Sequence, residues 1–291
     1  MQAKLKIVLA MLIYGSIGAF VRKINLSPSE IAFFRAVIGS VFLIGVSCFL
    51  GQKPAYEAIK RNLPCLGFSG AALGINWILL FQAYENTSIA NATLSYYFAP
   101  IFVILLAPLI LKEKLTPVRV VCVLAAMAGL FLIVKAGSSS QGITFNHPLG
   151  ICYGLSAAAF YASVILLNKF VKNLSGLETT LVQLICAVLV LFPYTAFKDN
   201  LSPAGMNPHT IVLVLIIGLV HTGFAYFLFF TAIKELKSQT VAVLSYIDPV
   251  AAVIIAALFL GEALNFMQIA GGLLILGATF LSETVAVSMN T

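Results

Sequence analysis

Apolar residues follow one another in long stretches along the whole chain, and short polar segments separate these stretches. A helix needs about 20 residues to cross the hydrocarbon core of a bilayer, which is about 30 Å thick. Lipid offers the backbone no hydrogen-bond partners, so a single crossing segment has to be helical. The pattern predicts an all-α polytopic membrane protein whose ten transmembrane helices cover residues 4–22, 29–50, 62–84, 88–111, 117–135, 148–170, 178–198, 209–233, 238–260 and 266–285.

The composition agrees with a chain that lipid surrounds. Of the 291 residues, 61% are hydrophobic and 9% are charged, whereas charged residues make up about 25% of a soluble domain. The 17 Lys and Arg residues lie singly or in pairs rather than in a patch, which argues against a nucleic-acid partner. Because the five cysteines lack metal-binding spacing and no nucleotide-binding or hydrolase motif is present, we expect no metal, no cofactor and no enzyme activity.

The basic residues fall mainly on one side of the predicted membrane. Cytoplasmic loops of membrane proteins carry an excess of Lys and Arg. One side holds four of them, namely Arg22, Lys23, Lys135 and Lys198. The other side holds twelve, namely Lys4, Lys6, Lys53, Lys60, Arg61, Lys112, Lys114, Arg119, Lys169, Lys172, Lys234 and Lys237. The chain is therefore predicted to be an integral multi-pass membrane protein with both termini in the cytoplasm.

Residues of the first half of the chain recur in the second half at a constant distance. One shift pairs Gly74 with Gly223, Tyr97 with Tyr246, Pro100 with Pro249 and Glu113 with Glu262, and a shift one residue shorter pairs Ser27 with Ser175 and Glu30 with Glu178. The sequence therefore predicts two related halves, residues 1–137 and 148–291, with five spans in each. Because five is an odd number, the second half is predicted to lie inverted relative to the first.

The matched segments carry motifs that are typical of one family. They are Tyr96-Tyr97-Phe98-Ala99-Pro100 and Leu111-Lys112-Glu113-Lys114-Leu115 in the first half, and Ser245-Tyr246-Ile247-Asp248-Pro249 and Leu260-Gly261-Glu262-Ala263-Leu264 in the second. With these motifs the whole chain resembles the EamA-type members of the drug/metabolite transporter superfamily. The resemblance implies two EamA-like five-helix repeats in a bacterial or archaeal cell membrane, and secondary transport of a small-molecule substrate through a central cavity. Monomer and homodimer are both compatible with it.

Two matched prolines, Pro100 and Pro249, fall inside predicted spans. Proline removes a backbone donor and clashes with the preceding turn of a helix. Transporters with inverted repeats bind their substrate near the midplane, where helices are interrupted. We predict that the two prolines are hinges beside the binding site, and a purely structural kink is the alternative.

Charged residues within predicted spans are the first candidates for substrate recognition, because an unpaired charge there costs at least about 2.5 kcal/mol. Asp248 is predicted to attract a cationic group or to carry a coupled proton, and the alternatives are a helix cap beside Pro249 or an ion pair with Arg35. Arg35 itself is expected either to bind a substrate carboxylate or to lie near the outer interface and pair with Glu30. His221 is expected either to serve proton coupling or to be a hydrogen-bonded core histidine.

Aromatic and amide side chains at helical spacing are the second group of candidates. Trp77 and Tyr226 occupy matched positions, as do Tyr97 and Tyr246, and aromatic rings can stack on an organic solute or a cation. Ordinary packing and hydrogen bonding between helices are the alternatives. The predicted substrate-binding residues are Trp77, Tyr97, Tyr226, Tyr246, Asn76 and Tyr14.

Together these features predict a secondary active transporter that exports a small organic metabolite, such as an amino acid, an amine or a drug-like solute, by alternating access. A nucleotide-sugar or sugar-phosphate exchanger of the same superfamily would need more buried Lys or Arg for phosphate than Arg35 alone. A membrane enzyme would need several convergent ionisable groups at one interface, which the sequence does not indicate. A scaffold without transport activity is the remaining alternative.

Overall fold

The computed structural model describes residues 2–21, 23–52, 54–87, 92, 95–112, 115–137, 146–199, 207–260 and 266–288. The regular elements in these ranges are all helical: α1 (Gln2–Val21), α2 (Pro28–Phe49), α3 (Tyr56–Asn86), α5 (Ala99–Leu111), α6 (Pro117–Gly137), α7 (His147–Asn168), α8 (Gly176–Asp199), α9 (Pro208–Ile216), the π-helix η2 (Ile217–Phe224), α10 (Ala225–Glu235), α11 (Ser238–Leu244), α12 (Ile247–Leu260) and α13 (Phe266–Ser288). Each predicted span contains helix, which confirms the predicted fold class. The matched pair Glu113 and Glu262 lies outside the described residues.

The matched serines Ser27 and Ser175 start corresponding helices in the two halves. The Ser27 side chain accepts a hydrogen bond from the Glu30 backbone at 3.2 Å, and the Glu30 carboxylate accepts one from the Ser27 backbone at 2.9 Å. Ser175 and Glu178 form the same reciprocal pair at 3.2 and 2.9 Å. Such a pair satisfies two backbone donors that the start of a helix leaves free. The sequence match therefore reflects the same local cap at the starts of α2 and α8.

Polar contacts at one end of the bundle show in which directions α1, α7 and α10 run. Lys6, near the start of α1, forms an ion pair with Glu235, the last residue of α10, at 3.6 Å. Lys234 donates a hydrogen bond to the carbonyl oxygen of Leu174, which follows α7, at 2.8 Å. Helix α1 therefore begins at the end of the bundle where α7 ends, so these counterparts run in opposite directions.

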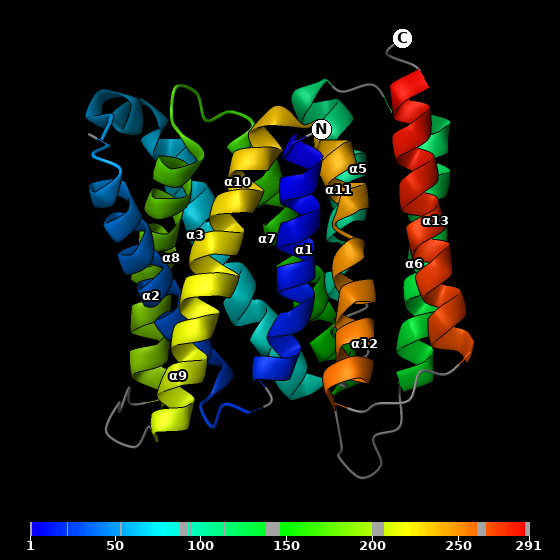
Figure 1. Ribbon diagram of the computed structural model, residues 1–291, viewed down its shortest axis with the longest axis horizontal. Helices are drawn as coiled ribbons and strands as arrows, with labels where there is room; N and C mark the ends of the chain where they lie inside the picture. The colour runs from blue at the N-terminus through cyan, green and yellow to red at the C-terminus, as the bar shows by residue number, and fades with distance from the viewer. Residues whose placement is uncertain are drawn as a thin grey trace.

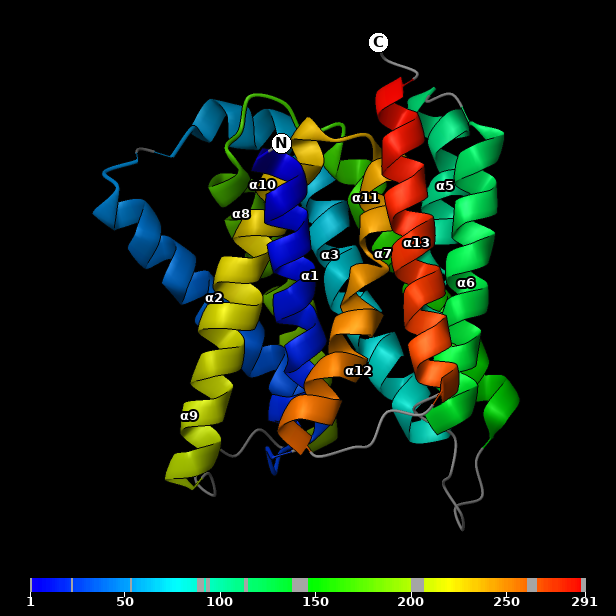
Figure 2. The ribbon, with the colours of Figure 1, turned by 45° about the vertical axis from the view of Figure 1, so that its right-hand side comes forward.

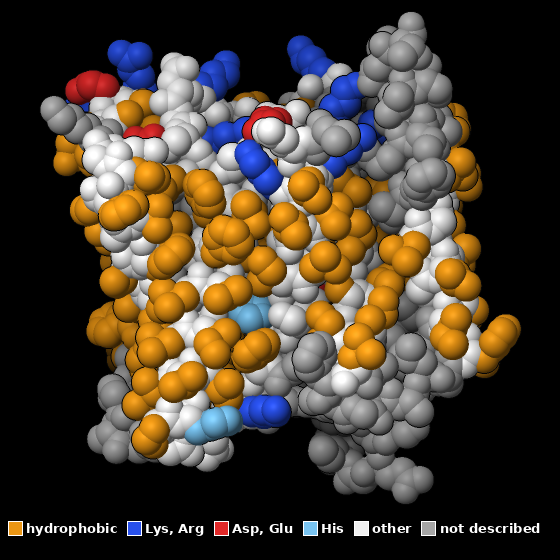
Figure 3. Space-filling model, in the orientation of Figure 1, with side chains coloured by type: hydrophobic (Ala, Val, Ile, Leu, Met, Phe, Trp, Pro, Cys, Tyr) orange, Lys and Arg blue, Asp and Glu red, His pale blue; other side chains and the backbone are white. Residues whose placement is uncertain are grey.

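We call this end of the molecule, where α1 begins and α10 ends, the basic end. Figure 3 shows that Lys and Arg side chains gather there, beside a broad band of hydrophobic side chains. A band of this kind suits contact with lipid. The placement of the basic end in the cytoplasm stays a prediction.

The packing of the helices repeats between the halves with the roles exchanged. Helix α1 contacts α10 and α12, and its counterpart α7 contacts α3 and α5. Corresponding helices also contact each other, since α2 packs on α8 and α6 packs on α13; Figure 1 shows α6 and α13 side by side at one edge of the bundle. Two inverted repeats produce this exchanged pattern, while the boundaries at residues 137 and 148 stay a prediction.

Several helices of the described residues are long and apolar enough to cross a membrane. Five meet both requirements over the ranges Pro28–Phe49, Tyr56–Ala83, Pro148–Asn168, Gly176–Lys198 and Pro208–Glu235. Large apolar side chains on the outside of the bundle include Phe49 and Phe197, both 91% exposed. Exposed apolar residues at this density belong in lipid rather than in water. The chain is therefore an integral membrane protein.

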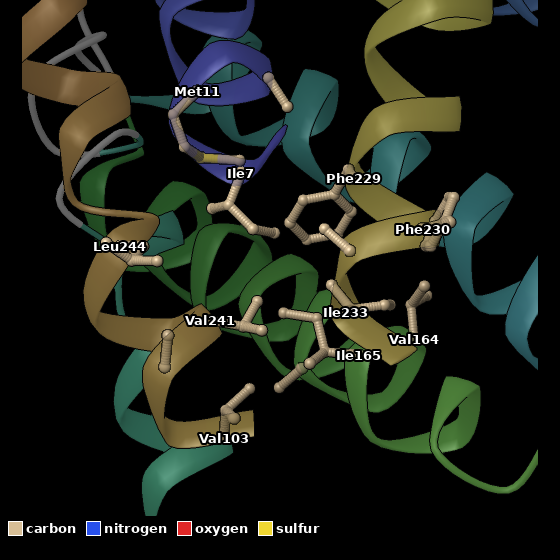
Figure 4. Packing of buried hydrophobic residues seen from close by; sticks show 14 of the residues in the cluster. Ile7, Met11, Val103, Val164, Ile165, Phe229, Phe230, Ile233, Val241 and Leu244 are labelled. Atoms are coloured by element: carbon tan, nitrogen blue, oxygen red, sulfur yellow. The ribbon is translucent and has the colours of Figure 1, made fainter. Parts of the chain in front are cut away.

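A tightly packed apolar group lies between the basic end and the middle of the bundle. Figure 4 shows side chains of α1, α5, α7, α10 and α11 converging in it. We call this group the basic-end core, and it consists of Ile7, Met11, Val103, Val164, Ile165, Phe229, Phe230, Ile233, Val241 and Leu244, all buried. Because five helices contribute to it, the basic-end core fills the bundle interior on this side of the middle.

Candidate functional site

Aromatic residues from α1, α3, α7 and α10 meet at the basic-end core, with which they share Phe229. The ring centroid of Tyr226 lies 5.4 Å from that of Tyr14 and 5.9 Å from that of Trp77, both in edge-to-face geometry. The Tyr161 ring stacks on Phe229 with a centroid distance of 6.3 Å. We call these five residues the aromatic cluster. The structure thus brings together three predicted residues, Tyr14, Trp77 and Tyr226.

Arg35 of α2 points into the aromatic cluster and is only 9% exposed. Its guanidinium carbon lies 4.5 Å from the centroid of the Trp77 ring and 5.9 Å from that of Tyr226. Its Nε donates a hydrogen bond to the Thr222 hydroxyl at 3.0 Å. A cation over aromatic rings gains about 0.5–2 kcal/mol, most where water is excluded. The terminal guanidinium nitrogens keep their donors without an acceptor among the described residues.

The expected alternative for Arg35, an ion pair with Glu30 near the outer interface, is wrong. The Glu30 carboxylate instead caps the start of α2 through the Ser27 backbone. Residues three or four apart share one face of a helix, whereas Glu30 and Arg35 are five apart. The cap therefore holds Glu30 on a different face from the one that turns Arg35 toward Trp77.

Asp248 reaches the same region from α12. The Tyr97 side chain lies close to its carboxyl group, and Tyr14, Tyr161 and Tyr226 lie within electrostatic range of it. Asp248 is half-buried. The predicted alternative of an ion pair with Arg35 is wrong, because no such pair exists within the described part of the chain. Two opposite charges therefore border the aromatic cluster without contacting each other.

A close approach of α1 to α12 places Tyr14 beside Asp248. A Cβ at Gly15 would lie 2.7 Å from the Cβ of Ala251 and 2.8 Å from the carbonyl oxygen of Asp248. Real side chains do not tolerate such distances, so only glycine allows the two helices this contact. The neighbouring residue, Tyr14, is held against the site as a result.

The Tyr14 hydroxyl is buried and has no hydrogen-bond partner among the described residues, a property that it shares with Asn76 Oδ1 and His221 Nδ1. Most buried polar atoms are hydrogen-bonded, and each exception calls for an explanation. A hydroxyl of this kind is suited to bind a polar group of a ligand.

Both matched prolines follow an interruption of the helix. Helix α5 begins at Ala99 with Pro100 in its first turn, and α12 begins at Ile247, two residues before Pro249 and after the end of α11 at Leu244. The Tyr246 hydroxyl donates a hydrogen bond to the carbonyl oxygen of Tyr97 at 3.4 Å, which gives one carbonyl at the interruption a partner. The two interruptions therefore contact each other, with Tyr246 buried between them.

His221 and Thr222 lie in the π-helix η2, which the sequence does not reveal. His221 Nε2 lies 2.8 Å from the Ser16 hydroxyl, and its ring packs edge to face on Phe20, with 5.0 Å between centroids. The Thr222 hydroxyl donates to the carbonyl oxygen of Ile217 at 3.1 Å while it accepts from Arg35. The wider turn of a π-helix often occurs at functional sites. Within η2 His221 faces α1 while Thr222 faces α2, and Thr222 is a site residue that sequence reasoning missed.

Asn76 lies apart from the aromatic cluster in its contacts, although it precedes Trp77. Its amide nitrogen donates to the carbonyl oxygen of Ala157 on α7 at 2.7 Å, and its side chain is completely buried. The bond joins α3 to α7, as expected for a polar residue that links membrane helices. This hydrogen bond serves helix packing, while the Asn76 amide oxygen is buried without a hydrogen-bond partner among the described residues, so the role of Asn76 in substrate binding stays a prediction.

Comparison with known proteins places this geometry in a family. The model of the EamA-like transporter family matches the chain twice, over residues 2–135 and 148–284. An uncharacterized transporter, YxxF, of Bacillus subtilis is 31% identical over 96% of this chain and 89% of its own length. The protein RarD of Escherichia coli is 24% identical over 90% of this chain and 86% of its own length. Solute carrier family 35 member G1 of Mus musculus is 26% identical over 94% and 75%.

The fold itself also has a solved counterpart. A crystal structure with 18% sequence identity superimposes with a TM-score of 0.82 and covers 99% of both chains. At that identity the likeness establishes the fold and no more. The double match of the family model spans most of the chain, in agreement with the motifs at Pro100 and Pro249. The chain therefore belongs to the EamA-like transporter family of the drug/metabolite transporter superfamily, and it is a membrane transporter.

Proposed function

We propose that this protein is a secondary active transporter that exports a small organic metabolite, an amino acid or an amine, by alternating access. The observation that carries the proposal is the pair of opposite charges, Arg35 and Asp248, on two sides of the aromatic cluster. Substrate would bind between them. Transport would be driven by a gradient of the solute itself or of protons.

The charges favour a substrate with a cationic amine and, in an amino acid, a carboxylate. The Asp248 carboxyl group suits an ammonium group, and aromatic rings add cation–π attraction. The terminal nitrogens of Arg35 can bind a carboxylate with two parallel hydrogen bonds. An intramembrane charge is costly unless it is paired, so a substrate that brings the opposite charges stabilises both residues.

The packing of the bundle supports alternating access. The basic-end core closes the interior on one side of the aromatic cluster, and inverted repeats allow the opposite closure by exchanging the conformations of the two halves. The interruptions before Pro100 and Pro249 would serve as hinges, because few backbone hydrogen bonds have to break there. In this proposal Asp248 also carries the coupled proton, and His221 helps to fasten η2 to α1.

Transport by the purified protein tests the proposal. The protein is reconstituted in liposomes, and uptake of radiolabelled amino acids and amines is measured with and without a proton gradient, against empty liposomes. We expect protein-dependent uptake of at least one compound that carries an ammonium group. If sugar phosphates or nucleotide sugars are exchanged and no ammonium compound is moved, the assigned substrate class is wrong. If no compound is moved although some bind, the transport proposal fails.

A further inference from the structure

A second candidate binding site lies at the basic end, outside the aromatic cluster. The first turns of α3, before Pro64 interrupts its hydrogen bonding, lie across the end of the bundle rather than along it (Figure 2). A cavity of about 730 Å³ opens beside these turns, which is within the range of about 300–1,000 Å³ for small-ligand sites. Its lining residues are Ala55, Tyr56, Glu57, Ala58, Arg61, Asn62, Lys172 and Asn173.

Hydrogen bonds hold the two walls of this cavity together. The Asn62 amide nitrogen donates to the carbonyl oxygen of Lys172 at 2.8 Å, and the Lys172 backbone nitrogen donates to the Asn62 amide oxygen at 3.0 Å. The Ala55 backbone nitrogen donates to the Glu178 carboxylate at 2.9 Å. The segment after α7 is thus fastened to α3, and the first turn of α8 to the residue before α3, so both walls of the cavity are held in place by the protein itself.

The charges around the cavity favour an anion. Arg61 and Lys172 line it, both are exposed, and neither forms an ion pair within the described ranges. Glu57 is the acidic side chain in the lining, so the balance is one positive charge. Basic pockets at the cytoplasmic ends of membrane helices are suited to lipid headgroups.

The apolar surface beside the cavity decides between a lipid and a soluble anion. Among the lining residues Tyr56 is 75% exposed, and Leu63, which follows the lining residue Asn62 on α3, is 52% exposed. Such side chains are costly in water, whereas at the interface they contact acyl chains while the polar groups meet headgroups. A free phosphate would use the cations but not these apolar residues.

We propose that this cavity binds the phosphate headgroup of an anionic phospholipid, with Arg61 and Lys172 contacting the phosphate and the exposed apolar residues contacting the acyl chains. The site is independent of the transported solute. Because Glu57 faces the same cavity, its charge opposes the binding.

Lipid binding is measured by native mass spectrometry of the purified protein with the anionic lipid phosphatidylglycerol or the zwitterionic lipid phosphatidylcholine. Glycerol 3-phosphate is measured in the same way as a soluble anion without acyl chains. We expect preferential binding of phosphatidylglycerol and none of glycerol 3-phosphate at the same concentration. Arg61→Gln and Lys172→Gln should each weaken phosphatidylglycerol binding about fivefold, since a basic residue near the headgroups contributes about 1 kcal/mol. Glu57→Gln should strengthen it.

Lys237→Gln is the matched control, because Lys237 is exposed and basic but does not line the cavity. Equal effects of Lys237→Gln and Arg61→Gln would overturn the proposal in favour of unspecific charge attraction. Equal binding of both lipids, or binding of glycerol 3-phosphate as strong as that of the lipid, would overturn it as well. Folding of each variant is checked by its melting temperature in phosphatidylcholine.

Discussion

The two repeats share the arrangement of their helices but differ in the charges that border the aromatic cluster. Arg35 on α2 corresponds to Gln183 on α8, and Asp248 on α12 corresponds to Ala99 on α5. Gln183 is completely buried and donates to the Ser69 hydroxyl at 2.6 Å, so it joins α8 to α3. Arg35 instead donates a hydrogen bond to the Thr222 hydroxyl and places its guanidinium group over the Trp77 ring.

This difference separates residues that serve the fold from the two charges to which we assign substrate binding in the proposed function. The capping boxes at Ser27 and Ser175 recur because both halves need the same helix starts. In the proposed function the two charges occur once each because a site with one cation and one anion would orient a substrate, whereas a symmetric site would bind it in two orientations. The predictions below test that asymmetry.

The largest effect is expected for a change of Asp248, the acidic residue whose counterpart in the first repeat is uncharged. Asp248→Asn should lower the transport rate of an ammonium substrate about 100-fold, because the bound ammonium would lose a hydrogen bond to a charged group, which contributes about 1.5–3 kcal/mol. Liposome uptake measures this effect. Glu235→Gln, at the exposed end of α10, is the control and should transport normally. Gradient-driven uptake by Asp248→Asn equal to that of the parent would remove Asp248 from the mechanism.

Making the first repeat resemble the second should affect substrates selectively. Arg35→Gln should weaken binding of amino acids about tenfold, since hydrogen bonds to charged groups contribute about 1.5–3 kcal/mol, and it should leave amines without a carboxylate nearly unaffected. Affinities are measured by thermal shift or by competition in uptake. An equal loss for both classes of compound would show that Arg35 acts by supporting Trp77 and Tyr226 rather than by binding the carboxylate.

The matched aromatic pair tests what the repeats have in common. Trp77→Ala and Tyr226→Ala should each weaken substrate binding about fivefold, from the loss of cation–π attraction and stacking. Phe197→Ala, on the lipid-facing surface, should leave affinity unchanged. Affinities equal to the parent in both variants would assign Trp77 and Tyr226 to packing.

The smallest effect is expected for the unpartnered hydroxyl. Tyr14→Phe should weaken substrate binding about threefold, because a neutral hydrogen bond contributes about 0.5–1.5 kcal/mol. Tyr161→Phe on the corresponding helix is the comparison. An unchanged affinity together with a higher melting temperature would mean that the Tyr14 hydroxyl is only a buried group without a partner, and not a contact to substrate.

The sequence was sufficient to predict the fold, because apolar stretches and the residues that start or interrupt helices act locally. Long apolar stretches must become helices in lipid, and Ser27, Ser175 and the two prolines mark starts and interruptions that need no distant partner. The predicted spans agree with the helices to within a few residues for α2 and α8, whose starts are capped. Six residues at the start of α3 lie outside the predicted span, since they are too polar to count as membrane helix.

The geometry of the site depended on contacts between residues that lie far apart in the sequence. The sequence identified Arg35, Trp77, Tyr226 and Asp248 as candidates but could not decide whether Arg35 turned to Glu30, to Asp248 or to the rings. Contacts of Arg35 with Thr222 in η2 and with the Trp77 ring on α3 decided between these partners, and both residues lie far from Arg35 in the sequence.

The apolar stretches, the distribution of charges and the recurrence of residues are properties of the sequence itself. They determined that this chain is a bundle of membrane helices with two related halves. The tertiary structure alone decided that two opposite charges border one aromatic cluster without touching, and that Asn76 and Tyr246 hold helices together. The reason is physical: a side chain's partner inside a bundle depends on which helix faces it, and that neighbour is set by packing rather than by the local sequence.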